Sequence, residues 1–259
     1  MELEKNSVIH GDCLKVMKDI PDKSIDMINC DLPYGTTACK WDTIIPFEPL
    51  WKQYKRIIKD NGAIVLSGTE PFSSYLRLSN SAWYKYDWIW NKKRPANWAL
   101  SKYVPLKITE NILIFCKSST NNAGSKNTAE IMMYNPQGIQ SCNRRVVSTI
   151  KNSIGKESKN FTKHDRILKT TNYPKNLIYF KQDNCKTHPT QKPVALYEYL
   201  IKTYTNEGDT VLDNCAGSGT TAVACINLNR NYILIEQEQK YVDICNQRIS
   251  EATRQMRIF

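Results

Sequence analysis

A glycine-rich turn in the C-terminal third of the chain constrains the fold more than any other feature. Residues 213–221 read Asp-Asn-Cys-Ala-Gly-Ser-Gly-Thr-Thr, after the apolar run 210–213 and before a helical pattern. Glycines let the backbone approach a ligand closely, and the N-terminus of a helix presents free N–H groups. Glu236 ends the next apolar run, 23 residues after Asp213, where nucleotide-binding sheets place the carboxylate that binds ribose hydroxyls. The pattern predicts a nucleoside-binding turn; the alternative is an ordinary tight turn.

Apolar runs and helical patterns alternate along most of the chain, which predicts an α/β fold with parallel strands. In a nucleotide-binding sheet the glycine turn normally follows the first strand. Here one further strand and a helix follow it, so the other strands come from upstream and the order is circularly permuted. The predicted strands are 7–10, 25–30, 63–66, 86–90, 111–115, 210–213 and 232–235; the predicted helices are 13–20, 46–59 (capped at Asn61-Gly62), 194–204, one from about 219 and a last one after 236.

A second motif, Asp31-Leu32-Pro33-Tyr34, directly follows the predicted strand 25–30. Ligand sites in open α/β sheets lie at the carboxyl ends of the strands. At that edge the motif would place a carboxylate, a backbone carbonyl and an aromatic ring around one pocket. Taken alone, it is equally well a proline-containing turn.

The positive charge of the chain is concentrated in one segment. The net charge is +11, and residues 117–186 hold 13 lysines and arginines against 4 acidic residues. Periodicity is weak there, and Asn, Ser, Thr, Lys and Gly dominate. A nearly neutral body with one basic segment predicts an insertion that binds a polyanion such as nucleic acid. The alternative is a solvated loop.

The nine cysteines include no Cys-x-x-Cys pair, so we expect reduced thiols and no metal site. No stretch approaches the roughly 20 apolar residues of a membrane-spanning helix. Charges at Glu2, Glu4 and Lys5 stand where a signal peptide would be apolar. We therefore expect a cytoplasmic protein that does not bind membranes.

Together the two motifs resemble the amino-methylating DNA methyltransferases of the β arrangement, in which a (D/N/S)-P-P-(Y/F) motif precedes the target-recognition region and the glycine motif comes last. Segments 9–14, 110–115 and 188–193 also look like the family's, and the resemblance covers about residues 8–116 and 187–250. It implies a Rossmann-like, circularly permuted fold that binds S-adenosylmethionine. Residues 1–116 would form the catalytic half, 117–186 a basic target-recognition insertion, and 187–259 the cofactor-binding half.

The resemblance implies transfer of a methyl group from S-adenosylmethionine to adenine N6 in double-stranded DNA, after the base has left the helix. A cytosine-N4 methyltransferase is the first alternative, although that group usually has Ser in place of Asp31. A regulator that binds nucleotide and DNA without catalysis is the second, and methylation of RNA or of protein amides is the third. A cognate restriction endonuclease, a homodimer and a bacterial or phage source stay open.

The implied chemistry gives each residue of the tetrad a role. The lone pair of an exocyclic amino group is delocalised into the ring, so hydrogen bonds accepted from its N–H groups make the nitrogen a better nucleophile. Asp31 would accept one and the carbonyl of Leu32 the other, while Pro33 stiffens the backbone and Tyr34 stacks on the base. Leu32 replaces the family's first proline, and Cys215 stands where the family prefers Phe.

On the cofactor side, the resemblance places the turn from Ala216 to Gly219 against the methionine moiety and Glu236 against the ribose. Asp12 would contact the adenine amino group, with Cys13 beside it; the alternative for Asp12 is a helix N-cap. Thr190 and Lys192 would line the cofactor carboxylate. The expected cofactor contacts are Asp12, Cys13, Thr190, Lys192, Asp213, Ala216, Gly217, Ser218, Gly219, Thr220 and Glu236.

Basic and aromatic residues are candidates for contacts with DNA, because lysine and arginine bind phosphates and arginine also suits guanine edges. Trp83, Trp88, Trp90 and Trp98 are candidates for stacking on bases. Trp88 and Trp90 alternate along a predicted strand, which favours core packing for at least one of them. The expected DNA contacts are Arg94, Trp98, Lys102, Arg144, Arg145, Lys151, Lys163 and Arg166.

Overall fold

The computed structural model describes residues 4–36, 42–120, 131–151, 161–183 and 191–256. The chain forms two compact units, the first made of Met1–Asn135 and Asn176–Phe259 and the second of Pro136–Lys175. The second unit lies inside the basic segment 117–186, and the rest of that segment belongs to the first unit. Among the described residues, no helix has the length and apolar character needed to cross a membrane.

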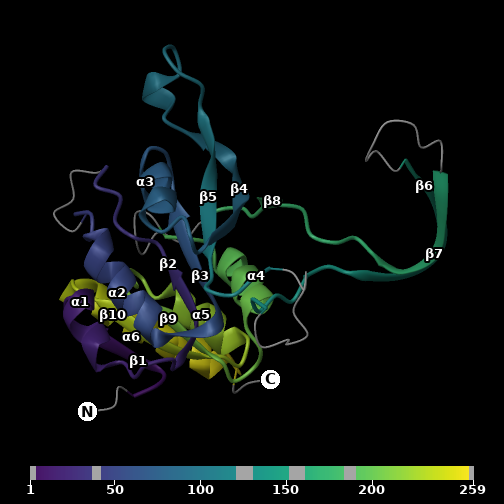
Figure 1. Cartoon of the computed structure of the whole chain (residues 1–259). Helices are drawn as coiled ribbons and strands as arrows, with labels where there is room; N and C mark the ends of the chain where they lie inside the picture. Colours follow the sequence, from purple (N-terminus) through teal and green to yellow (C-terminus); the bar gives the residue numbers. More distant parts are fainter. Residues whose placement is uncertain (1–3, 37–41, 121–130, 152–160, 184–190, 257–259) are drawn as a thin grey trace. The chain divides into compact units, whose positions relative to one another are not determined.

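An eight-stranded mixed sheet forms the centre of the first unit (Figure 1). Strands from both ends of the chain complete it, since β9 and β10 lie between β1 and β2, as the permuted order predicts. The α/β fold is confirmed, but the expectation of parallel strands fails at one edge, because β4 and β5 form an antiparallel hairpin and β5 runs antiparallel to β3. In sheet order the strands are β1 (Ser7–His10), β10 (Asn231–Glu236), β9 (Thr210–Asp213), β2 (Ile25–Cys30), β3 (Ile58–Gly68), β5 (Lys107–Phe115), β4 (Tyr84–Ala96) and β8 (Leu177–Tyr179).

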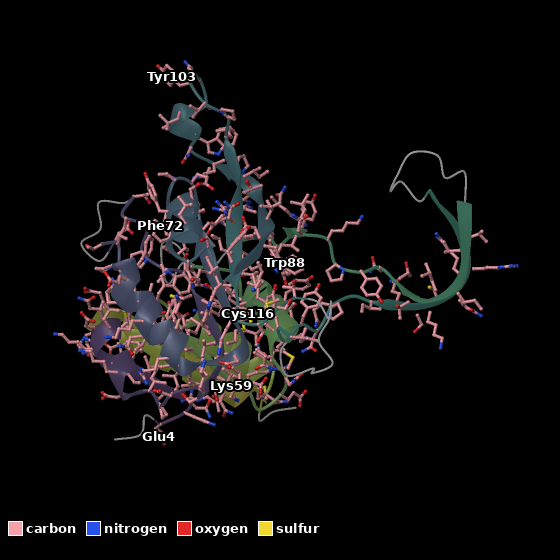
Figure 2. All side chains as sticks on the ribbon, viewed as in Figure 1. Glu4, Lys59, Phe72, Trp88, Tyr103 and Cys116 are labelled. Carbon is pink, nitrogen blue, oxygen red and sulfur yellow. The ribbon has the colours of Figure 1, made fainter. Side chains whose placement is uncertain are left out.

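Helices cover both faces of this sheet (Figure 1). Neighbouring strand residues point to opposite faces. Met27 therefore packs into the apolar layer under α4 and α5, whereas Ile28 packs into the layer under α1, α2 and α3. Side chains fill both layers, with Trp88 in the first and Phe72 in the second (Figure 2). The helices are α1 (Cys13–Val16), the 3-10 helix η1 (Met17–Asp19), α2 (Phe47–Ile57), α3 (Phe72–Ser79), the 3-10 helix η2 (Trp98–Leu100), α4 (Val194–Tyr204), α5 (Thr220–Asn227) and α6 (Gln239–Met256).

The expected cap of α2 is corrected by the structure. The helix ends at Ile57 and β3 begins at Ile58, so Asn61-Gly62 lies inside a strand. A Cβ on Gly62 would come within 2.6 Å of the carbonyl oxygen of Asp26, so glycine at this position lets β3 lie close against β2. The glycine that the sequence predicted as a helix cap is therefore needed for the packing of two strands.

The second unit is an antiparallel ribbon of β6 (Gln140–Lys151) and β7 (Phe161–Thr171). Arg144 pairs with Leu168 and Arg145 with Ile167 across it. Val147 and Ile167 are 56% and 62% exposed, so apolar residues are solvated along with the basic ones. None of the ribbon side chains whose burial the structure describes is buried, and apolar residues that are not buried need not alternate, so weak periodicity did not predict these strands.

Candidate active site

A cavity of about 790 Å³ lies at the carboxyl ends of the central strands and joins the two motifs. The tetrad Asp31–Tyr34 follows β2, the turn Ala216–Ser218 follows β9, and Glu236 ends β10. Parallel neighbours end at the same edge of a sheet, so these residues meet although they are far apart in sequence. Gly219 does not border the cavity, and Thr190 lies outside the described residues. The expected cofactor contacts that border it are Asp12, Cys13, Lys192, Asp213, Ala216, Gly217, Ser218, Thr220 and Glu236.

The glycine turn depends on backbone geometry that only glycine adopts easily. Gly217 and Gly219 have φ angles of +53° and +75°, in the left-handed region. A Cβ on Gly219 would lie 3.0 Å from Sγ of Cys245 on α6. The N–H of Gly217 donates to Oε2 of Glu236 at 2.8 Å, so the turn is tied to the end of β10.

Glu236 and Asp12 border the cavity with part of their hydrogen-bonding capacity already used. Oε1 of Glu236 accepts the N–H of Glu238 at 2.9 Å, and the backbone of Gln237 also interacts with this carboxylate. Burial raises the pKa of Glu236 above its ordinary value. Oδ1 of Asp12 accepts the N–H groups of Leu14 and Lys15 at 2.8 and 3.2 Å, so its role as the N-cap of α1 is confirmed.

Asp213 borders the same cavity, but its carboxylate is bound within the turn. It accepts the hydroxyl of Thr221 at 2.5 Å and the N–H of Cys215 at 3.1 Å. Burial raises the pKa of Asp213 to about 7, against the opposing effect of these hydrogen bonds. Asp213 therefore stabilises the conformation of the glycine turn.

The tetrad is held in place by contacts on each side. Leu32 is only 3% exposed, and it packs in the core while bordering the cavity. The hydroxyl of Tyr34 donates to Oδ1 of Asp31 at 2.5 Å, and its ring packs on Phe72 with centroids 4.9 Å apart. Asp42 accepts the N–H groups of the two residues after the tetrad, each at 2.9 Å.

A network of buried charges surrounds Asp31. The ammonium group of Lys192 lies 2.6 Å from Oδ2 of Asp31 and 2.7 Å from Oε1 of Glu110. Lys92 lies 2.7 Å from the other oxygen of Glu110. The Lys192 and Glu110 side chains are only 8% and 4% exposed, whereas Asp31 is 21% exposed. Lys192, expected beside a cofactor carboxylate, is therefore bound to two carboxylates of the protein itself.

The network shifts the pKa of each of its members. Burial raises the pKa of Asp31; Lys192 opposes this shift and the charge of Glu110 adds to it. Burial alone would also raise the pKa of Glu110, but Lys192 and Lys92 reverse the effect and hold that pKa at about 2. Burial would lower the pKa of Lys192, yet the two carboxylates raise it above its ordinary value. Glu110 therefore stays ionised, and Lys192 stays charged between its partners.

Glu110 and Lys92 were not among the expected site residues. Glu110 belongs to a segment that resembles the family, but the sequence assigned it no role. Glu110 lies inside β5 and is 4% exposed, and a carboxylate buried to this extent needs a partner. Its partner Lys192 lies just before α4, so the pairing depends on the tertiary fold.

The expected DNA contacts divide into two groups. Arg94, Trp98 and Lys102 are exposed on the β4–β5 hairpin, and none of them borders the cavity. Trp88 and Trp90 are 2% and 1% exposed, so core packing is confirmed for both, although Trp90 also borders the cavity. In the second unit, Arg144 and Arg145 are exposed on β6; Lys151, Lys163 and Arg166 belong to β6 and β7, but their side chains lie outside the described residues.

The family profile described as DNA methylase matches residues 25–247, which include both motifs and everything between them. The chain belongs to this family. The resemblance noted in the sequence and the expected fold class are thereby confirmed.

Individual relatives support the same assignment. The type II methyltransferase M.HinfI of Haemophilus influenzae is 29% identical over 95% of this chain and 68% of its own length. The DNA adenine methyltransferase YhdJ of Escherichia coli strain K12 is 28% identical over 96% of this chain and 84% of its own. The crystal structure of the M1.HpyAVI–SAM complex, at 25% identity, matches with a TM-score of 0.60 over 94% of this chain and 98% of its own. The cytosine-N4-specific PvuII methyltransferase matches with a TM-score of 0.65 over 98% of this chain and 92% of its own, but at 16% identity it shows the fold alone.

Proposed function

We propose that this protein transfers the methyl group of S-adenosylmethionine to the N6 amino group of adenine in double-stranded DNA. The observation that carries the proposal is that Asp31–Tyr34 and the turn tied to Glu236 border one cavity of about 790 Å³. Cavities of this size hold a ligand with most of its surface buried. A cofactor and an extruded base would therefore meet between the two motifs.

The residues on the cofactor side fit S-adenosylmethionine. Glu236 borders the cavity with a carboxylate that can accept a ribose hydroxyl, and Gly217 has no Cβ to obstruct the methionine moiety. Asp12 and Cys13 border the part of the cavity beside β10, where the adenine would lie. When bound, the cofactor supplies an electrophilic methyl group on a sulfonium.

The tetrad and its network would activate the amino group. Asp31 accepts a hydrogen bond from one N–H, and the carbonyl of Leu32 accepts the other. Lys192 fixes the orientation of the Asp31 carboxylate, and Glu110 keeps Lys192 anchored when Asp31 takes a new hydrogen-bond donor. Tyr34, held by Asp31 and Phe72, offers a ring for the base to stack on.

Adenine is favoured over cytosine because cytosine-N4 enzymes usually have Ser at the position of Asp31. The name of the relative YhdJ, a DNA adenine methyltransferase, also supports adenine. A regulator without catalysis would not need Asp31, Pro33 and Tyr34 of the tetrad or the buried network around Asp31.

Double-stranded DNA is the proposed partner of the basic segment. The division into 1–116, 117–186 and 187–259 belongs to the same proposal, with 117–186 as the target-recognition region. The β6–β7 ribbon exposes Arg144 and Arg145, and a two-stranded ribbon fits the major groove. We extend the proposal to action in the cytoplasm, where bacterial DNA lies. A paired endonuclease and a homodimer stay open.

One experiment tests the reaction. The purified protein is incubated with labelled S-adenosylmethionine and mixed genomic DNA, and the DNA is digested to nucleosides. We expect label in N6-methyladenine. Label in N4-methylcytosine would overturn the adenine assignment, and absence of label from the DNA, and from RNA in a parallel incubation, would favour the regulator.

A further inference from the structure

The loop between β4 and β5 exposes a cluster of large apolar side chains. The exposed fractions are 66% for Trp98, 50% for Leu100, 82% for Tyr103 and 47% for Val104. Figure 1 shows both strands continuing away from the helices to this loop, and Figure 2 shows Tyr103 at its end. We call Trp98–Val104 the hairpin tip. Apolar side chains gathered at the end of a protrusion mark a contact surface.

The backbone of the hairpin tip is ordered by its own hydrogen bonds. The N–H groups of Leu100 and Ser101 donate to the carbonyls of Asn97 and Trp98 at 2.9 and 3.2 Å. The N–H groups of Tyr103 and Val104 both donate to the carbonyl of Leu100, at 2.9 and 3.0 Å. The tip therefore presents its rings on a preorganised turn, which lowers the entropy lost on binding.

The charge of the hairpin indicates the class of its partner. Between Asn91 and Thr109 the chain has five basic residues and no acidic one. Lys92 is bound to Glu110, but Lys93, Arg94 and Lys102 are exposed. Positive side chains attract the phosphates of nucleic acid, and exposed aromatic rings can stack on its bases. The composition of the hairpin therefore favours nucleic acid as the partner.

The hairpin also forms one wall of the active-site cavity. Trp90 and Ala96 from β4, Asn97, and Lys107 and Glu110 from β5 all border it. The hairpin tip follows directly on this wall, since Trp98 is the next residue after Asn97. DNA that delivers a base into the cavity along this wall would therefore lie close to the tip.

We propose that the hairpin tip inserts Trp98 and Tyr103 into the duplex at the space left by the extruded base. This inference rests on the proposed function, in which the target base leaves the duplex. It adds that the two aromatic rings compensate for the stacking that the duplex then loses. Extrusion loses the stacking and pairing of the target base, and an inserted apolar ring restores stacking to the remaining bases. Lys93, Arg94 and Lys102 contact the flanking phosphates.

The alternative is that the apolar hairpin tip forms a contact between two copies of this chain. A symmetric dimer brings the same patch of each copy together. Two tips in contact would also bring the exposed basic residues of both copies together, and like charges oppose such a contact. The charge therefore favours DNA.

The test uses the full chain and its Trp98→Ala and Tyr103→Ala variants. Met256→Ala is the matched control, because Met256 is 44% exposed on α6, outside the hairpin. Single-turnover methylation is measured first on the duplex that the wild type methylates. The target adenine is then placed opposite an abasic site, where no partner base needs to be unpaired. Binding of S-adenosylmethionine is measured by calorimetry, and oligomeric state by sedimentation.

We expect the two tip variants to methylate the normal duplex at least about tenfold more slowly and to recover to within roughly threefold of the wild type on the abasic duplex. Cofactor binding stays unchanged in all variants, and the control behaves as the wild type. Tip variants that match the wild type on the normal duplex would overturn the insertion, as would a loss that the abasic duplex does not reverse. A changed sedimentation coefficient with unchanged rates would identify a contact between copies instead. A wild type that methylates no DNA would contradict the proposed function itself, which separates the two failures.

Discussion

Two carboxylates share one ammonium group beside the tetrad, and this arrangement controls the charge of Asp31. Asp31 must be ionised to accept a hydrogen bond from an amino group. Its pKa is raised by burial and by the charge of Glu110, and Lys192 opposes the rise. The rate of methylation should therefore fall at low pH, with an acid limb that reports the pKa of Asp31.

Glu110→Gln and Lys192→Met should move this acid limb in opposite directions. Removal of the Glu110 charge lowers the pKa of Asp31, so the limb shifts to lower pH. Loss of the Lys192 ammonium raises the pKa of Asp31, so the limb shifts to higher pH. Single-turnover rates measured from about pH 5 to 9 decide this.

Asp60→Asn is the control for these profiles, since Asp60 makes ion pairs with Lys23 and Lys117 outside the cavity. Its profile should match that of the wild type. If the acid limb shifts in the same direction in Glu110→Gln and Lys192→Met, the charges of Glu110 and Lys192 do not control the pKa of Asp31. The two residues would then have only a packing role.

Asp31→Ala should lose transfer and keep the cofactor. The Asp31 carboxylate contacts Tyr34 and Lys192, whereas Glu236 contacts the glycine turn. Loss of a hydrogen bond that acts on the reacting group costs roughly 100-fold or more in rate. Calorimetry with S-adenosylmethionine should give an affinity close to that of the wild type. Loss of cofactor binding would mean that the two sites are assigned the wrong way round.

At the scale of elements, the sequence predicted the strands that carry the site and missed parts that depend on tertiary contacts. β1, β2, β9 and α4 match their expected bounds, because buried strands and amphipathic helices have strong apolar patterns. In β6 and β7 none of the side chains that the structure describes is buried, and the sequence there has no such pattern. The pairing of Lys192 with Glu110 joins residues 82 positions apart, and no local signal reports it.

The start of α5 offers an element-level prediction with an internal control. Gly219 and Gly208 both have positive φ angles, +75° and +81°, but only Gly219 has neighbours that a Cβ would meet. Gly208→Ala should cost about 1 kcal/mol of unfolding free energy from backbone strain. Gly219→Ala should cost more, about 2–4 kcal/mol, because Cys245 must also move.

Chemical denaturation measures both costs, and calorimetry measures cofactor affinity. Only Gly219→Ala should also weaken S-adenosylmethionine binding, since the turn of which it is part is tied to Glu236. Equal losses of stability in the two variants would contradict the contact with Cys245 as the cause.

At the scale of the whole molecule, all described residues that line the cavity belong to the first unit, and the second unit contains the exposed basic ribbon. The chain leaves and re-enters the first unit at fixed points. The N–H of Asn135 donates to the carbonyl of Thr203 at 2.7 Å, and the carbonyl of Asn176 accepts the N–H of Ile89 at 2.7 Å. An isolated two-stranded ribbon adds little stability of its own. The stability of the first unit should therefore not depend on the second.

Replacement of Pro136–Lys175 by a flexible Gly-Ser linker of about 20 residues should separate cofactor binding from DNA recognition. We expect a melting temperature within about 3 °C of the wild type and an unchanged stabilisation by S-adenosylmethionine. Methylation of DNA should fall by at least roughly 100-fold, because the phosphate contacts of the ribbon are lost. A variant that binds the cofactor and still methylates the wild-type sites would contradict this and place target recognition in the first unit.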